Sequence, residues 1–172
     1  MLNRGGLHPY QKKAVDFITH KKKCALFLDM GLGKTTIALT AVSDLLDSFV
    51  IKKTLVIAPL RVCNSVWQQE SKKWEHLKHL VMSLCTGSAA QRKAGLSTKS
   101  DIYLINRENV VWLVEECKKT RRWPFDCVIV DESSSFKNPS AKRFKKLKSV
   151  LKHINVMMGI YTVGIHVIKE GE

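Results

Sequence analysis

The sequence is short of acidic residues, has an odd and scattered set of cysteines, and contains no long apolar run. Its five cysteines include no C-x-x-C pair and no nearby histidine pair, which argues against a zinc site and disulfides and favours a reducing setting. No apolar stretch approaches the about 20 residues that span a bilayer, and the N-terminus has no apolar signal region. We therefore expect a soluble protein without a membrane partner.

The shortage of acids leaves a strongly basic chain. The sequence contains 29 Lys and Arg against 15 Asp and Glu, which gives a net charge of +14. Such an excess favours a polyanionic partner, because each neutralised phosphate releases bound counterions. Nucleic acid is the first partner to consider, and a merely soluble basic protein is the alternative.

Short apolar runs alternate with stretches of helical periodicity along the 172 residues. This alternation predicts an α/β domain with a parallel sheet of about five to seven strands and helices on both faces. The domain is expected to cover residues 1–155, followed by an atypical tail, 156–172, that could supply one or two more strands. In chain order we expect helix 8–20, strand 24–29, helix 34–48, strand 54–59, helix 62–76, strand 80–85, helix 88–95, strand 101–106, helix 108–120, strand 126–131 and helix 140–152.

A glycine-rich segment, "LFLDMGLGKTT", joins the first apolar run to a helical pattern. Glycines let the backbone turn its N–H groups around a phosphate, and the following helix offers the positive end of its dipole. Lys34 would reach the β- and γ-phosphates and the Thr35 hydroxyl would hold Mg²⁺. The pattern G-x-x-x-x-G-K-[ST] has glycine where this chain has Leu28, so an ordinary glycine turn is the alternative.

A second segment, "FDCVIVDESSS", ends an apolar run with two adjacent carboxylates. Acidic residues at such a site suit Mg²⁺, which takes a few carboxylates together with phosphate oxygens and water. Asp131 would hold the metal through its water shell, and Glu132 would orient or deprotonate the attacking water. A solvated turn that caps a helix is the alternative.

The segments "LHPYQKKAVDFI", "DMGLGKTT", "LVIAPLRVCNSVWQQE" and "VIVDESSSFKN", in this order, resemble the first motor lobe of the Swi/Snf-type, helicase-like ATPases of helicase superfamily two. That DEAD/DEAH-like group includes short versions carried by bacteria and phages. The resemblance covers residues 7–150 and implies a RecA-like P-loop NTPase domain. The loop of this family commonly lacks its first glycine, so Leu28 agrees with it.

The resemblance also implies roles for individual residues. Gln11 is similar to the glutamine that reads adenine, with Tyr10 beside it. Arg61 and Asn106 are similar to residues that contact one nucleic-acid strand, and Asp131 with Glu132 forms the second ATPase motif. The cofactors implied are ATP and Mg²⁺, and the partner is double-stranded DNA, with RNA as the alternative. The implied nucleotide loop comprises Met30, Gly31, Leu32, Gly33, Lys34, Thr35 and Thr36.

The implied function is the ATP-binding lobe of a DNA-dependent ATPase that moves along duplex DNA. Three departures qualify it. Ser134 stands where many relatives carry histidine or glutamine, an L-T-G-T-P segment is absent after residue 150, and the second lobe, which supplies arginines to the γ-phosphate, is missing. We therefore expect half of a motor, with little turnover alone and a tendency to self-associate. Its expected location is the cytoplasm or another intracellular nucleic-acid compartment, the host cytoplasm if phage-encoded.

Two other functions remain open at this point. One is a nucleotide-responsive nucleic-acid-binding or assembly module without catalysis, which the missing second lobe favours. The other is a P-loop kinase for a small substrate, which ranks low because the segment after the acidic strand is rich in lysine and has no lid-like insertion.

The sequence also contains three basic clusters and four tryptophans. The segment 140–152 predicts a basic amphipathic helix, and Lys21–Lys23 and Lys118–Arg122 add two further clusters. Each is either a solvated face or a set of phosphate contacts without sequence readout. The four tryptophans, by contrast, are expected to pack between helices rather than to stack on bases.

Overall fold

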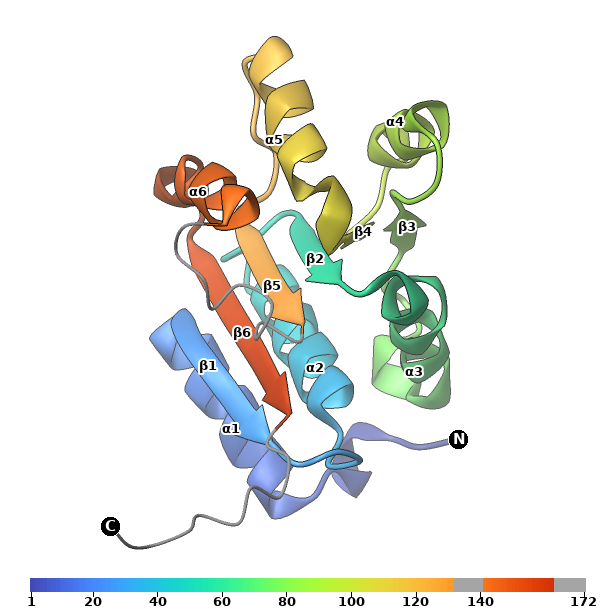
Figure 1. Ribbon diagram of the computed structural model, residues 1–172. Coiled ribbons are helices and arrows are strands. Elements are labelled where there is room, and N and C mark those ends of the chain that lie inside the picture. Colours follow the sequence, from blue (N-terminus) through green and yellow to red (C-terminus); the bar gives the residue numbers. More distant parts are fainter. Residues whose placement is uncertain (132–140, 163–172) are drawn as a thin grey trace, which may run out of the picture.

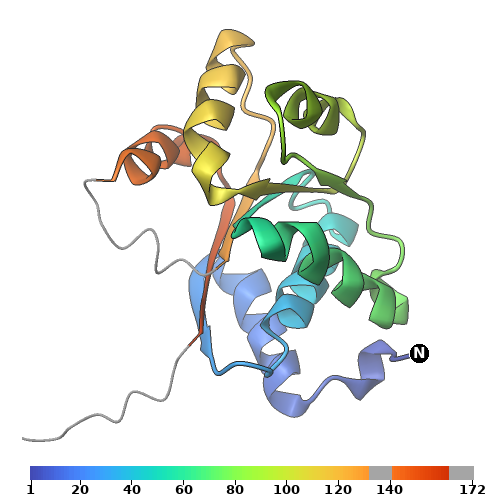
Figure 2. The same ribbon diagram turned by 45° about the vertical axis from the view of Figure 1, so that its right-hand side comes forward.

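The computed structural model describes residues 1–131 and 141–162, which fold around a six-stranded sheet with parallel strand pairs (Figures 1 and 2). The strands follow the order β1-β6-β5-β2-β4-β3 across the sheet. The predicted α/β class and parallel sheet are therefore confirmed. The strands are β1 (Lys23–Leu28), β2 (Thr54–Ala58), β3 (Met82–Leu84), β4 (Ile102–Asn106), β5 (Cys127–Asp131) and β6 (Val156–Thr162).

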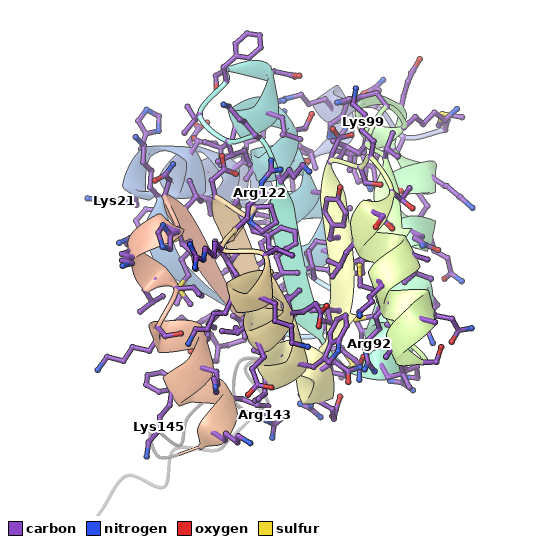
Figure 3. The ribbon with its side chains drawn as sticks, turned by 90° about the horizontal axis from the view of Figure 1, so that it is seen from above. Lys21, Arg92, Lys99, Arg122, Arg143 and Lys145 are labelled. Carbon is purple, nitrogen blue, oxygen red and sulfur yellow. The ribbon has the colours of Figure 1, made fainter. Side chains whose placement is uncertain are left out.

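The common direction of the strands gives the sheet two chemically different edges. Segments that follow strands, including the glycine-rich loop after β1, lie at the carboxyl edge. Segments that lead into strands lie at the amino edge. Lys21 and Arg122, shortly before β1 and β5, mark the amino edge in Figure 3, which views the molecule from above.

The helices agree with the predicted order but differ from it in length. The predicted helix 62–76 is divided, because the chain starts with a π-helical turn, continues as α3 and ends in an extended residue, Trp74, before a short 3-10 turn. The α-helices are α1 (Pro9–Lys21), α2 (Lys34–Asp47), α3 (Trp67–Lys73), α4 (Ala89–Ser97), α5 (Val110–Lys119) and α6 (Lys142–Lys148). The short helical segments are η1 (Arg4–Gly6), η2 (Val62–Val66), η3 (Glu75–Leu77), η4 (Arg107–Asn109) and η6 (Leu151–His153). None of the described helices is long and apolar enough to cross a membrane.

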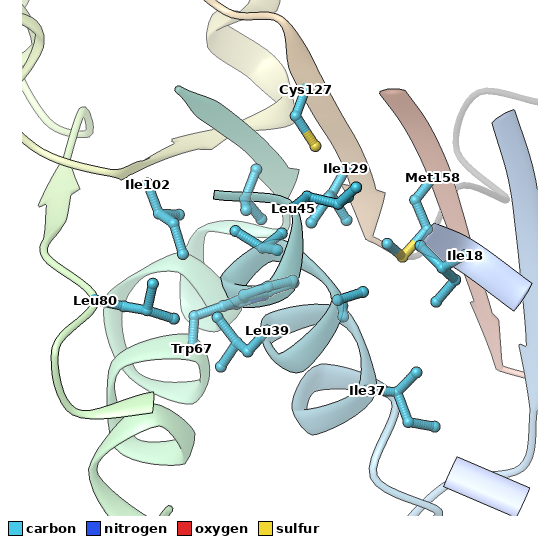
Figure 4. Close-up of a cluster of buried hydrophobic side chains, with 14 of the residues drawn as sticks. Ile18, Ile37, Leu39, Leu45, Trp67, Leu80, Ile102, Cys127, Ile129 and Met158 are labelled. Atoms are coloured by element: carbon cyan, nitrogen blue, oxygen red, sulfur yellow. The ribbon is translucent and has the colours of Figure 1, made fainter. Parts of the chain in front are cut away.

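Helices cover the sheet on both faces and bury two separate cores. Alternate residues of a strand point to opposite faces, so Ile129 joins the core under α1, α2 and α3, whereas Val130 joins the core under α5 and α6. The first core centres on Leu39 and Trp67, both fully buried (Figure 4). Every residue of β2 and β4 is buried, which explains why these strands are continuous apolar runs.

Strand β6 lies in the interior of the sheet, between β1 and β5. Its register places Ile160 beside Leu26 of β1 and Asp131 of β5. The residues expected to begin an atypical tail thus start with a strand that joins the two halves of the sheet. Gly159 interrupts the apolar pattern there, and a glycine weakens the strand signal that a sequence carries.

The packing of α4 on β3 depends on a glycine. A methyl group at Gly95 would overlap the backbone carbonyl oxygen of Leu84. We expect Gly95→Ala to lower the free energy of unfolding by about 1–3 kcal/mol, because the helix must move off the strand. Gly6→Ala, where a methyl group meets open space, is the matched control in urea denaturation. A stabilisation by Gly95→Ala of about 0.5–1 kcal/mol, the usual gain within a helix, would contradict this packing.

Candidate functional site

The loop between β1 and α2 takes a shape that requires glycine. Gly31 and Gly33 have φ angles of +82° and +76°, in the left-handed region that other residues rarely adopt. A methyl group at Gly33 would also overlap the side-chain amide of Gln11, whereas Gly31 faces open space. Gly33 is therefore fixed by both conformation and contact.

Helix α2 begins without the side-chain cap that satisfies the first N–H groups of many helices. Its N-cap is Gly33, which has no side chain to accept from them. Helix α4 shows the contrast, because the Ser88 hydroxyl accepts the Gln91 N–H at 3.2 Å. The first N–H groups of α2 therefore suit an anion, which the helix dipole also favours.

Lys34 is held inside this loop. Its ammonium group donates to the carbonyl oxygens of Leu28 at 3.0 Å and Asp29 at 2.8 Å. These contacts keep the cation at the turn that the glycines form. Thr35 and Thr36 follow in the first turn of α2, with Thr35 half-buried and Thr36 buried.

Two side chains of α1 meet a single carbonyl of the loop. The Tyr10 hydroxyl donates to the Leu32 carbonyl oxygen at 2.9 Å, and the Gln11 amide donates to the same oxygen at 3.3 Å. Gln11 is 5% exposed, and its own carbonyl accepts the His8 N–H at 2.8 Å. The structure thus brings the predicted residues Tyr10 and Gln11 onto the predicted loop, and Gln11 is not the exposed helix glutamine that its position alone indicates.

Glu70 of α3 is a site residue that the sequence did not reveal. Its carboxylate accepts from the Thr36 hydroxyl at 2.7 Å, the Trp74 indole at 3.3 Å and the Lys73 ammonium at 2.9 Å. Burial opposes ionisation of Glu70, but the hydrogen bonds from Thr36, Lys73 and Trp74 outweigh it and lower its pKa. Glu70 is therefore a carboxylate that fixes the start of α2 against α3.

A cavity of about 280 Å³ lies beside the loop. Its lining includes Gln11, Gly33, Thr36 and Glu70 together with Leu2 of the N-terminal segment. That segment is tied down, because Leu2 exchanges backbone hydrogen bonds with Lys73 and Glu75 at 3.1 and 2.8 Å, and Arg4 pairs with Asp44. The cavity combines hydrogen-bonding groups with apolar surface, as small-molecule sites do.

Asp131 ends β5 at the same edge as the loop. One strand, β6, lies between β5 and β1, so Asp131 at the end of β5 and the loop after β1 are two strand positions apart. The indole of Trp67 donates to the Asp131 carboxylate at 3.1 Å, from a side chain with no exposed surface. The expected packing role of Trp67 is confirmed, and this contact adds a second role. Glu132 and Ser134 lie outside the described residues.

Arg61 and Asn106 follow the neighbouring strands β2 and β4. Asn106 lies directly beside Ala58 in the sheet, and Arg61 is exposed just beyond it. Asn106 is 7% exposed, donates to Glu108 at 3.0 Å and accepts from Asn109 at 2.6 Å. Of these two predicted residues, Arg61 thus presents its side chain to solvent, while Asn106 organises its own turn.

The site fits a nucleotide with its magnesium better than a metal held by protein alone. Within residues 1–131 and 141–162, no three His, Cys, Asp or Glu side chains gather around one point. Mg²⁺ does not need such a cluster, since it binds through one or two protein oxygens together with phosphate oxygens and water. The hydroxyl of Thr35 and the carboxylate of Asp131 are oxygens of this kind at the carboxyl edge.

The order of strands and the loop geometry define a RecA-like α/β domain. The chain matches the family model of the SNF2-related domain over residues 10–158, and it belongs to this family. It is 37% identical over 148 residues to protein p41 of Acyrthosiphon pisum secondary endosymbiont phage 1, a match that covers 85% of this chain and 32% of p41. It is 26% identical to human Chromodomain-helicase-DNA-binding protein 7, over 91% of this chain and 6% of that protein.

Solved structures share the fold. The Sulfolobus solfataricus SWI2/SNF2 ATPase core in complex with dsDNA superposes with a TM-score of 0.74 at 24% identity, over 95% of this chain and 33% of that one. The UvsW helicase from bacteriophage T4 gives a TM-score of 0.67 at 17% identity, over 90% of this chain and 52% of that one. The predicted RecA-like fold and Swi/Snf-type family are confirmed, and the chain spans 32% of the length of its phage relative.

The ionised form of Glu70 should make stability depend on pH. Its pKa is lowered from the ordinary value of 4.5, so its contribution is complete above about pH 4.5 and is lost as the pH falls through the lower pKa of the folded state. We expect Glu70→Gln to be less stable than wild type at neutral pH, with the difference shrinking on acidification. Urea denaturation at several pH values measures it.

Glu75→Gln, at an exposed carboxylate of η3, controls for the loss of one charge. A stability difference between wild type and Glu70→Gln that stays constant from neutral to acidic pH would show that the charge of Glu70 does not matter.

Proposed function

We propose that this chain is the ATP-binding lobe of a DNA-dependent ATPase of helicase superfamily two, one that moves along duplex DNA. The observation that carries the proposal is the glycine loop before α2, which two residues of α1 hold through the Leu32 carbonyl at the same edge as Asp131. Membership of the SNF2-related family supports it independently.

In this proposal the residues of the chain divide the work of binding ATP. The first N–H groups of α2 would donate to phosphate oxygens, and Lys34, which donates to the Leu28 and Asp29 carbonyls in this structure, would turn to the β- and γ-phosphates. Thr35 and Asp131 would hold Mg²⁺, and a bound ion would supply neutralisation of charge on the phosphates. Gln11 and Tyr10 face the adenine from the cavity beside the loop. Met30, Gly31, Leu32, Gly33 and Thr36 complete the loop.

Trp67 and Glu132 have different tasks in this proposal. The indole of Trp67 holds one oxygen of Asp131, which fixes the rotation of that carboxylate. Glu132 orients or deprotonates the attacking water, the positioning role that phosphoryl transfer requires. Loss of the Glu132 carboxylate would therefore leave ATP binding intact and remove the chemical step.

Duplex DNA is the proposed partner of the carboxyl edge. Arg61 is exposed there, and Asn106 holds the neighbouring turn in shape. Two similar proteins are named for DNA, one as an ATPase core in complex with dsDNA and one as a helicase-DNA-binding protein. RNA is the alternative partner, and binding measurements with duplex DNA and with RNA distinguish the two.

Turnover by this lobe alone is proposed to be weak. In phosphoryl transfer an arginine supplied by a partner contributes about 10³ or more in rate, and a lobe acting without such an arginine lacks that contribution. The second candidate is a nucleotide-responsive nucleic-acid-binding module without catalysis. The two candidates share the nucleotide site and differ in hydrolysis.

Lys34→Ala should abolish ATP binding. The variant removes the cation from the loop, so the phosphates lose their charge-assisted hydrogen bonds. Calorimetry with ATP and Mg²⁺ measures the affinity, and Lys13→Ala, at an exposed lysine of α1, makes the same change of charge elsewhere. Equal ATP affinity of wild type and Lys34→Ala would reject the nucleotide site.

Glu132→Gln should keep ATP binding and remove hydrolysis. Single-turnover experiments with ATP in the presence and absence of duplex DNA test this, because one round of hydrolysis is visible even when turnover is slow. DNA-stimulated hydrolysis by wild type but not by Glu132→Gln supports the ATPase. No hydrolysis by wild type, with intact ATP binding, would favour the binding module.

A further inference from the structure

Two basic segments that are far apart in the sequence meet at the amino edge of the sheet. Lys118, Arg121 and Arg122 lie at the end of α5 and in the turn before β5, while Lys152 and His153 lie in η6, just before β6. Strands β5 and β6 are parallel neighbours, so the segments that lead into them lie side by side. Helices α5 and α6 also pack together, with Lys146 and Glu115 paired at 3.1 Å.

The two segments enclose a cavity of about 250 Å³ whose lining holds several cations and no carboxylate. The cationic surface defined here consists of Lys118, Arg121, Arg122 and Lys152, all exposed, and His153 lies beside them. Arg122 also lines a second cavity, of about 470 Å³. Figure 3 looks onto this end of the molecule and labels Arg122.

The cations of this surface have no ion-pair partners in the described part of the chain, unlike the lysines around them. Lys93 and Lys119 both pair with Glu116, at 3.2 and 3.1 Å. By contrast, none of the four cations of the surface forms a salt bridge within residues 1–131 and 141–162. Unpaired like charges repel one another, and a bound polyanion removes that repulsion.

The chemistry of the surface favours a nucleic-acid backbone over an acidic protein. A protein interface normally has an apolar centre. Of the apolar residues at this cavity, Val114 and Val150 are buried and Cys117 and Trp123 are half-buried, whereas the four cations are exposed. Trp123 is the aromatic residue of the lining, and its indole is already used, donating to the Phe125 carbonyl at 2.7 Å while its ring packs edge-on against Phe125. Cations without a stacking platform bind phosphates and read no sequence.

We propose that the cationic surface binds the phosphate backbone of duplex DNA, at the end of the lobe opposite the nucleotide site. It is a second contact, separate from Arg61 at the carboxyl edge, and it does not depend on ATP. The lobe can then hold DNA at its amino edge whatever the state of its nucleotide site.

The test compares two triple variants with equal changes of charge. Lys118→Gln/Arg122→Gln/Lys152→Gln removes three cations of the surface. The control, Lys13→Gln/Lys72→Gln/Lys78→Gln, removes three exposed lysines from α1, from α3 and from just after η3. Fluorescence anisotropy with a short duplex of random sequence, without nucleotide, gives the affinity as a function of salt.

We expect the first triple variant to bind at least about tenfold more weakly at low salt and to have a shallower salt slope, by about 2 to 3, since each lost phosphate contact lowers the slope by about 0.9. The control should stay within about twofold of wild type and keep its slope. Equal losses in both variants, or no loss in the first, would overturn the proposal. Displacement of the duplex by polyglutamate at equal charge would indicate an acidic protein partner instead.

Lysine acetylation of the wild-type protein gives an answer that needs no variant to fold. Duplex DNA should protect Lys118 and Lys152 while leaving Lys72 and Lys78 reactive, and uniform protection or none would contradict the proposal. ATP binding by the first triple variant should equal that of wild type. If neither wild type nor the two triple variants bound ATP, the proposed nucleotide site would be rejected, but the result on DNA binding would be unaffected.

Discussion

The single direction of the strands is the constraint on which the rest of the structure depends. Because strands β1, β5, β2 and β4 are all parallel, the segments that follow them share one edge. The glycine loop, Asp131, Arg61 and Asn106 therefore lie along one edge of the sheet although they are spread over much of the sequence. A β5 that ran antiparallel to β1 would place the acidic motif at the opposite edge from the loop, and no local change could restore the site.

Hydrogen bonds that involve helices α1, α2 and α3 then fix the positions of the loop and of Asp131 at this edge. Two side chains of α1 donate to the Leu32 carbonyl of the loop. The Glu70 carboxylate of α3 accepts from the first turn of α2, and the Trp67 indole of α3 donates to Asp131. Each of these contacts involves a buried or half-buried polar group, for which loss of the partner costs more than the bond itself contributes. The helices are thus linked to the loop by groups that cannot shift independently, which gives the candidate site a defined shape before any ligand binds.

The sequence predicts the parts of this site that local chemistry determines. Gly33 and Lys34 stand in a pattern whose backbone shape few other residues permit, and Asp131 ends an apolar run, so both motifs are visible without the fold. Glu70 and Trp67 are not, because their roles arise only when α3 packs against α2 and the end of β5. The sequence predicts one or two more strands in the tail, but the position of β6 between β1 and β5 follows from strand order and not from its own residues. The meeting of the segments before β5 and β6 is equally invisible, since it follows from strand order, which periodicity does not encode.

Strand length also decides whether the two edges act separately. Strand β5 has five residues, and at about 3.3 Å per residue the carboxyl and amino edges are about 15 Å apart along it. The Debye length at physiological ionic strength is about 8 Å, so charges at one edge are largely screened from solvent-exposed charges at the other. Negative charge brought by a nucleotide to the loop would therefore neutralise little of the positive field around Arg122. On this argument the cationic surface at the amino edge would keep its attraction for phosphates whether or not a nucleotide occupies the loop.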